Sequence, residues 1–97
     1  MTQATLKVVE GGIVKVQGPL TFNSILPLLA QGEQILSTQQ TIVFDMQAVT
    51  QSDSAGLSLL IAWLRMAKKV GCAIQFKNIP LQLAAIVKVC GLEKIVK

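Results

Sequence analysis

The sequence contains no histidine and no tyrosine. Without an imidazole, neither a Ser-His nor a Cys-His nucleophile pair can form. No Gly-x-x-x-x-Gly-Lys-Ser/Thr phosphate loop is present, and the spacing of the five acidic residues places no two carboxylates in one pocket. The two cysteines are far apart and the carboxylates are scattered, so we expect no metal site. These absences predict a protein that is not an enzyme and that uses no cofactor.

Charged residues are also scarce. They make up 14% of the 97 residues, against about 25% in an average soluble domain, whereas hydrophobic residues make up 52%. A chain of this length forms one small domain, which we place over residues 1–97. With so few charges, much of its surface must be apolar. Such a surface predicts that a partner protein covers part of it.

The charge that remains is unevenly distributed. Residues 1–64 carry two lysines and four acidic residues, whereas residues 65–97 carry seven basic residues and a single acidic one, Glu93. A basic surface can serve nucleic acid or an anionic membrane. The basic residues are spread over the whole segment, however, and only one is an arginine. We therefore interpret them as solvated surface charge and expect no nucleic-acid partner.

No segment has the pattern of a targeting or membrane-spanning sequence. The first ten residues lack a basic stretch followed by an apolar core. The longest uncharged, largely apolar stretch, residues 54–64, is far shorter than the ~20 residues that a spanning helix needs. We therefore expect a cytoplasmic protein without direct membrane insertion. In that compartment Cys72 and Cys90 stay reduced, and we expect both in the core.

Strand-like runs alternate with helical apolar stripes along the chain. Residues 5–17 predict two strands joined by a tight turn at Gly11 and Gly12, and residues 18–23 predict a break. The next helix is expected to bury Ile25, Leu26, Leu29 and Leu36. We place this helix near residues 25–36, with Asn23 or Ser24 as its cap. The further expected elements are a strand at 41–45, a helix at 54–70, a strand at 72–77, a helix at 81–90, and a short strand or turn at 92–97.

The order β β α β α β α predicts an α/β fold. Parallel neighbours require crossover helices, so we expect a single domain with a mixed sheet of four or five strands. The uninterrupted apolar run TIVFD, residues 41–45, is typical of a central strand. In open sheets of this kind, sites form beyond the carboxyl ends of the strands. We therefore expect the functional residues in the loop that follows Asp45.

The helix predicted at residues 54–70 carries two apolar faces. The core stripe is Leu57, Leu60, Ile61, Leu64 and Ala67, and the second face is Ala55, Leu59, Ala62, Trp63, Met66 and Val70. The second face meets either another helix of the same domain or a partner protein. The shortage of charge favours the partner. We therefore expect Leu59, Trp63 and Met66 to be exposed in the isolated chain.

Three polar residues, Ser52, Asp53 and Ser54, stand at the start of this helix. Each can accept a hydrogen bond from the free N–H groups of the first turn, which favours a capping role. A serine at an exposed helix N-terminus also lies where a phosphate is well accommodated, near the positive end of the helix dipole. Gly56, within the first turn, would let a partner backbone come close. Both interpretations stay open.

The same residues resemble a known family. Residues 49–60, VTQSDSAGLSLL, are similar to the signature loop and helix of STAS domains, in which an Asp-Ser/Thr-x-Gly-Leu segment opens the second main helix. Residues 16–22, VQGPLTF, resemble the Gly-x-Leu turn after the second strand of that family. The resemblance implies a STAS fold over nearly the whole chain. It also matches Ser54 with the position that is phosphorylated in anti-anti-sigma members.

Among STAS proteins, the chain is most similar to the small subunit of Mla phospholipid ABC transporters, through its length, residues 18–29 (GPLTFNSILPLL) and the small residues Ala55 and Gly56. The resemblance implies a non-catalytic accessory subunit that binds an ATPase subunit of the MlaF type. The alternative is an anti-sigma factor antagonist that binds a kinase and is released when Ser54 is phosphorylated. The implied partner-binding residues are Asp53, Ser54, Ala55, Gly56, Leu59, Trp63 and Met66.

Overall fold

The computed structural model describes residues 4–91 and confirms the predicted order of elements. The strands are β1 (Thr5–Val9), β2 (Ile13–Leu20), β3 (Thr41–Ser52) and β4 (Ala73–Lys77), and the helices are α1 (Ile25–Thr38), α2 (Ser54–Val70) and α3 (Leu81–Val89). A short 3-10 turn, η1 (Glu10–Gly12), joins the first two strands. The element predicted at residues 92–97 lies outside the described residues.

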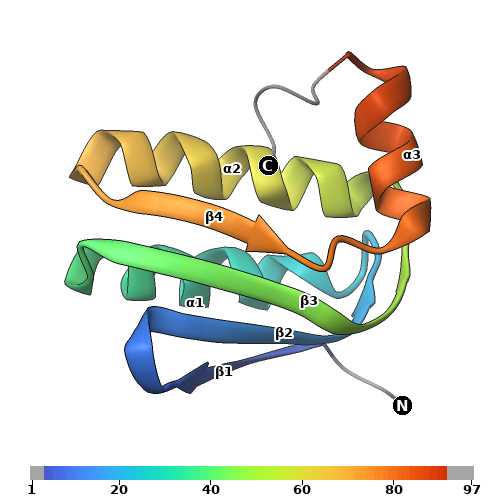
Figure 1. The fold of residues 1–97 in the computed structure, drawn as a ribbon. Helices are drawn as coiled ribbons and strands as arrows, with labels where there is room; N and C mark the ends of the chain where they lie inside the picture. The colour runs from blue at the N-terminus through green and yellow to red at the C-terminus, as the bar shows by residue number, and fades with distance from the viewer. Residues whose placement is uncertain (1–3, 92–97) are drawn as a thin grey trace.

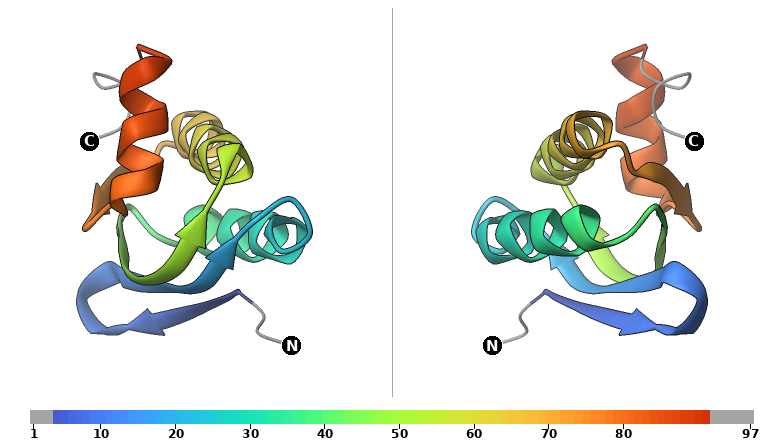
Figure 2. Two further views of the ribbon diagram at one scale, coloured as in Figure 1. Left: turned by 90° about the vertical axis from the view of Figure 1, so that its right-hand side faces the viewer. Right: turned by 90° about the vertical axis from the view of Figure 1, so that its left-hand side faces the viewer.

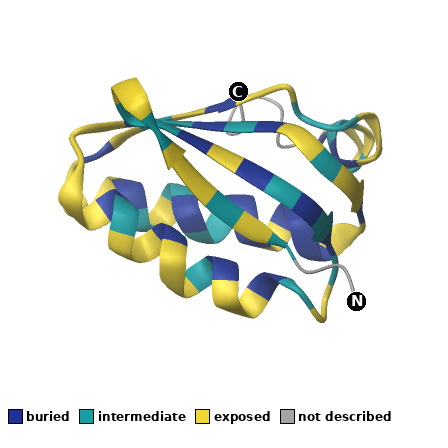
Figure 3. Cartoon of the chain, turned by 90° about the horizontal axis from the view of Figure 1, so that it is seen from below, coloured by how far each residue is buried: buried dark blue, intermediate teal, exposed yellow. Residues whose placement is uncertain are grey.

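The four strands form one mixed sheet in the order β1-β2-β3-β4 (Figure 1). Strand β1 pairs with β2 antiparallel, whereas β2 with β3 and β3 with β4 pair parallel. The helices lie on one face of this sheet (Figure 2). Lys15, Gln17 and Asp45 lie on the opposite face, which we call the open face. Figure 3 shows the molecule from the side of the open face, with the strands in front of α1 and α2. The prediction that residues 41–45 belong to a central strand is confirmed.

Strands β2 and β3 are longer than predicted. The expected break after Gln17 is wrong, because β2 continues through Gly18 and Pro19 to Leu20. The expected loop after Asp45 is also wrong, because β3 runs seven residues further, to Ser52. The two strands stay paired to their ends by two register shifts. Such irregularities let a strand with Gly and Pro remain in the ladder.

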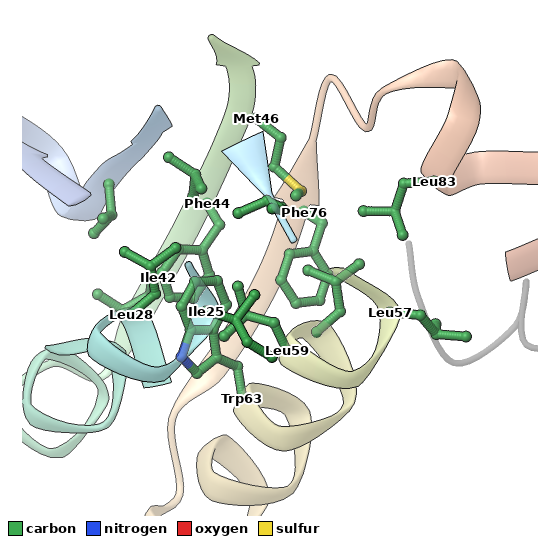
Figure 4. Packing of buried hydrophobic residues seen from close by; sticks show 14 of the residues in the cluster. Ile25, Leu28, Ile42, Phe44, Met46, Leu57, Leu59, Trp63, Phe76 and Leu83 are labelled. Atoms are coloured by element: carbon green, nitrogen blue, oxygen red, sulfur yellow. The ribbon is translucent and has the colours of Figure 1, made fainter. Parts of the chain in front are cut away.

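The hydrophobic core lies between the sheet and the helices. Alternate side chains of the two central strands point to the helices, as period-2 geometry requires; they are Val14, Val16 and Leu20 of β2 and Ile42, Phe44 and Met46 of β3. The Phe44 ring stacks on Trp63, with centroids 4.1 Å apart and planes 7° from parallel. Figure 4 shows Trp63 among Leu28 of α1 and Ile42 and Phe44 of β3. Trp63 is thus at the centre of the core.

The expectation that Leu59 and Trp63 are exposed is therefore wrong. Both have 0% exposed surface, and Met66 is half-buried. The alternative, that another helix of the same domain covers this face, is correct. Helix α1 packs there because Gly32 has no side chain: an added Cβ would overlap Trp63 Nε1 and lie 2.8 Å from Cζ2. A glycine at the crossing lets the two helices come close enough for the indole to fill the gap between them.

The cysteines behave differently from each other. Cys72 is buried, as predicted, and burial raises the pKa of its thiol. Cys90 is exposed, so its placement in the core was wrong. It follows the last residue of α3, and that helix buries only Leu83 and Val87. Val87 is the last residue of α3 that packs into the core, so the end of the helix and Cys90 after it lie outside the core.

Candidate functional site

Three helices begin at the same edge of the sheet. Since β2, β3 and β4 run parallel, their carboxyl ends meet there, and α1, α2 and α3 start from them (Figure 2, left). Two hydrogen bonds join the connections: Asp53 N donates to the Leu20 carbonyl at 3.2 Å, and Ser52 N donates to Gln82 Oε1 at 3.3 Å. We call the surface around these helix starts the carboxyl edge. The predicted residues Asp53 and Ser54 lie at this edge, directly after the carboxyl end of β3, although residues 46–52 between them and Asp45 belong to the strand and not to a loop.

The first turn of α2 is capped by Asp53 alone. The Asp53 side chain accepts from Ala55 N at 2.8 Å, and its carbonyl accepts from Gly56 N at 3.0 Å. Ser52 is buried and donates its hydroxyl to the Asp53 carbonyl at 3.2 Å, so it supports the turn without capping the helix. The interpretation of three equivalent caps is therefore wrong. Asp53 is the residue directly before the helix and has the extended backbone that a cap needs, whereas Ser52 lies one position too early and Ser54 is already helical.

Ser54 is the first residue of α2 and is exposed. Within residues 4–91 its hydroxyl has no hydrogen-bond partner, and its carbonyl accepts a long bond, 3.5 Å, from Ser58. The hydroxyl lies in the positive field of the helix N-terminus, where anions are stabilised. Ser54 is thus chemically free to contact a partner or to carry a phosphate, and it is not needed to hold α2 in place.

The neighbouring small residues serve internal packing. Ala55 and Gly56 are buried. A Cβ at Gly56 would overlap the Ser52 hydroxyl and lie 3.4 Å from Leu83 Cδ1. Gly56 therefore lets α2 pack against the end of β3 and the start of α3, and the expectation that it admits a partner backbone is wrong. Of the seven predicted contact residues, the structure leaves Asp53 and Ser54 exposed at the carboxyl edge.

Large apolar side chains at the same edge were missed from the sequence. Phe22 is 80% exposed, Leu26 71% and Leu81 88%. Phe22 lies in the β2–α1 turn, and Leu26 and Leu81 lie in the first turns of α1 and α3. The prediction that Leu26 is buried is wrong, because Ile25 and Leu28 are the residues of the first turn of α1 that face the core. The available signal was two consecutive apolar residues, Ile25 and Leu26, in the first turn of a helix, because they project about 100° apart around the axis and only one of them lies in the middle of the core-facing stripe.

The turn before α1 is rigid. The Ser24 hydroxyl donates to the Pro19 carbonyl at 2.6 Å and accepts from Thr21 N at 2.9 Å. Ser24 stands at the N-cap position of α1 but its side chain does not cap the helix; it closes the turn instead. These bonds fix the loop that carries Phe22. The apolar side chains of the carboxyl edge are therefore presented on a defined scaffold.

A second polar group lies on the open face. Asp45 Oδ1 accepts from Asn78 Nδ2 and from Gln47 N, both at 3.0 Å. The Asn78 bond first, and then the Gln47 bond, lower the pKa of the Asp45 carboxyl. Lys15 and Lys77 are its partners across the strands. The carboxylate is therefore stabilised in its charged form by local hydrogen bonds.

The described residues offer neither a metal centre nor a membrane-spanning helix. No group of three or more potential metal ligands of the His, Cys, Asp or Glu type comes together between residues 4 and 91. No helix in this part of the chain has the length and apolar character to cross a membrane.

Comparison with known proteins places this geometry in context. A family model described as "Mlab, STAS domain" matches residues 5–97. A chain of the Acinetobacter MlaFEDB complex in an ATP-bound conformation is 20% identical, with a TM-score of 0.83 over 95% of this chain and 96% of that chain. An anti-sigma factor antagonist from Mycobacterium paratuberculosis is 21% identical (TM-score 0.70; 99% and 83% covered). Bacillus SpoIIAA in its phosphorylated form is 17% identical (TM-score 0.71; 97% and 88% covered). At these identities the likeness to solved structures shows the fold.

Proposed function

Because the chain belongs to the MlaB-type STAS domain family, we propose that it is a non-catalytic accessory subunit that binds the ATPase subunit of an Mla-type phospholipid ABC transporter. The partner is an MlaF-like protein, and the chain is held at the inner membrane, on the cytoplasmic side, through that complex. The contact surface is the carboxyl edge, with Asp53 and Ser54 at its centre.

One observation carries this proposal: three large apolar side chains, Phe22, Leu26 and Leu81, are exposed at the starts of α1 and α3, the two helices that begin at the same edge as α2. Aromatic and aliphatic residues of this kind are the usual anchors of protein interfaces. The Ser54 hydroxyl is a small neutral group beside them. The MlaFEDB complex contains a chain that matches this one over nearly the full length of both, which supports a transporter partner.

A second candidate is an anti-sigma factor antagonist. The observation in its favour is the free hydroxyl of Ser54 at the N-terminus of α2, together with the likeness to SpoIIAA in its phosphorylated form. In this role a kinase phosphorylates Ser54, and the added charge of about −1.5 to −2 expels the partner from an apolar contact.

Substitution of Ser54 tests the contact. Ser54→Thr keeps the hydroxyl and should bind an MlaF-like ATPase as the parent does. Ser54→Glu places a charge in the contact without a partner, which is costly in a buried interface, so binding should be lost. Folding should not suffer, because an acidic residue in the first turn of a helix is favourable by about 0.3–1 kcal/mol. The measurement is titration calorimetry with the purified ATPase, alongside thermal unfolding.

The matched control is Gln75→Glu, which adds the same charge at an exposed position on β4. It should leave affinity unchanged. If Ser54→Glu binds as tightly as Gln75→Glu, Ser54 does not lie in the interface and the proposed surface is wrong. Intact-mass analysis of protein purified from its own cell then separates the two functions. A phosphorylated fraction that disappears in Ser54→Ala would favour the antagonist role; unmodified protein that copurifies with an ABC ATPase favours the transporter role.

A further inference from the structure

Helix α3 has no fully polar face. Seven of its nine residues are apolar, the exceptions being Gln82 and Lys88. Only Leu83 and Val87 are buried. A helix that is apolar on all sides is normally covered on all sides. In this structure the sheet and α2 cover one side of α3, and the other side faces away from both (Figure 2).

The side of α3 that faces away from the sheet and α2 carries a continuous apolar stripe, exposed with respect to the described residues 4–91. Leu81, Ala85 and Val89 follow one another at intervals of four residues, so they lie on one face over a length of about 12 Å. Leu81 is 88% exposed and Val89 87% exposed, and Ala85 is exposed between them. An open depression beside the stripe is lined by Ala85, Ile86, Val89 and Cys90, none of them charged. We call Leu81, Ala85 and Val89 the α3 stripe.

The stripe is continuous with the carboxyl edge, since Leu81 belongs to both. The start of α3 is fixed beside the start of α2 by the bond from Ser52 N to Gln82 Oε1 and by the contact of Leu83 with Gly56. A protein that contacts Ser54 therefore meets Leu81 and the stripe in a fixed position. No internal rearrangement is needed to present both surfaces together.

Area also favours a shared occupant. A specific interface buries about 800 Å² on each partner, roughly an eighth of the 6102 Å² surface of this chain. The stripe extends the surface of the carboxyl edge along α3. The stripe by itself is one short helix face, too small for a stable dimer of this chain.

We propose that the α3 stripe is the second half of the ATPase-binding surface, and that the ATPase presents to it an apolar helix or groove with acidic residues at its margin. The acidic margin follows from Lys88, the basic residue that flanks the stripe. This inference rests on the proposed function. It extends the proposed contact surface from Leu81 along α3 to Val89, over more than two helical turns.

Ala85→Glu tests the proposal with little risk to the fold. Ala85 is exposed in the middle of α3, and glutamate is a good helix former. We expect the variant to bind the MlaF-like ATPase at least tenfold more weakly than the parent, with an unchanged melting temperature. Val89→Ala, which removes apolar contact and improves helix propensity, should weaken binding severalfold. The matched control is Ala73→Glu. Ala73 is an exposed alanine at the start of β4, at the end of the strand opposite to the carboxyl edge, and this variant should bind like the parent.

The possible results are distinguishable. If the parent chain does not bind the ATPase, the proposed function fails. If the parent binds and Ser54→Glu does not, but Ala85→Glu binds normally, only the stripe proposal is overturned. It is also overturned if Ala85→Glu leaves ATPase affinity intact and instead dissociates a dimer in sedimentation, reduces flotation with anionic phospholipid vesicles, or lowers the melting temperature. These three results would identify a second copy, a membrane surface or the chain itself as the occupant.

Discussion

Gly32 gives the sharpest test of how the helices pack. It lies in the middle of α1 and is buried against the indole of Trp63. A Cβ at this position would overlap Nε1 and lie 2.8 Å from Cζ2, and both atoms belong to a ring that cannot yield easily. Stacking on Phe44 holds one side of that ring. We therefore expect Gly32→Ala to push α1 away from α2.

The magnitude follows from two opposing effects. Replacing glycine by alanine in a helix interior is ordinarily stabilising by about 1 kcal/mol. Overpacking a core costs typically about 1–3 kcal/mol, and the rigid contact at Gly32 places the cost at the upper end. The net loss in the free energy of unfolding is then about 2 kcal/mol. In a domain of 60–100 residues this lowers the melting temperature by roughly 8–16 °C.

Urea unfolding followed by circular dichroism at 222 nm measures the effect. Gln31→Ala, an exposed neighbour in the same helix, is the control and should change stability by only a few tenths of a kcal/mol. Trp63→Phe removes Nε1, so Gly32→Ala should cost less in that background than in the parent. A Gly32→Ala protein that is as stable as the parent, or more stable, would refute the close packing of α1 on Trp63.

Three further predictions concern other parts of the domain. Trp63→Ala should lower the free energy of unfolding by about 3–5 kcal/mol, the usual cost of removing a core aromatic side chain. Unfolding of this variant has to be measured by circular dichroism, because the substitution removes the only tryptophan and with it the fluorescence signal. A loss below about 1 kcal/mol would contradict the burial of Trp63. Asp45 is held ionised in the folded state, so its contribution to stability is present above its ordinary pKa of 3.8 and is lost as the pH falls through its lower folded value. Asn78→Gly suits the left-handed backbone at this position and removes the hydrogen bond that is the main cause of the lowered pKa of Asp45. The variant should therefore show a higher folded pKa of Asp45 in an NMR titration. An unchanged titration would exclude this hydrogen bond as the cause. A thiol reagent should label the exposed Cys90 rapidly and Cys72 only on unfolding, and equal rates would argue against the burial of Cys72.

The placement of the elements could be read from the sequence because local signals mark them. Asp53 and Gly71 bound α2 at residues 54–70, as predicted, since a side-chain cap and a left-handed glycine both act within one turn. Alternation of strands and helices required parallel pairing, and the apolar run at 41–45 required an inner strand. The hydroxyl of Ser54 at the start of α2 followed from the same local information.

Tertiary structure decided which apolar surfaces are covered. Periodicity gives the angle of a side chain around its helix, but an apolar face is compatible with a neighbouring helix or with a partner. Trp63 is buried because Gly32 of α1 lies opposite it, and this contact joins residues 31 positions apart. The length of β3 depended in the same way on its pairing with β2 through two register shifts. Phe22, Leu26 and Leu81 come together only because parallel strands bring three helix starts to one edge, so the candidate site is a product of topology.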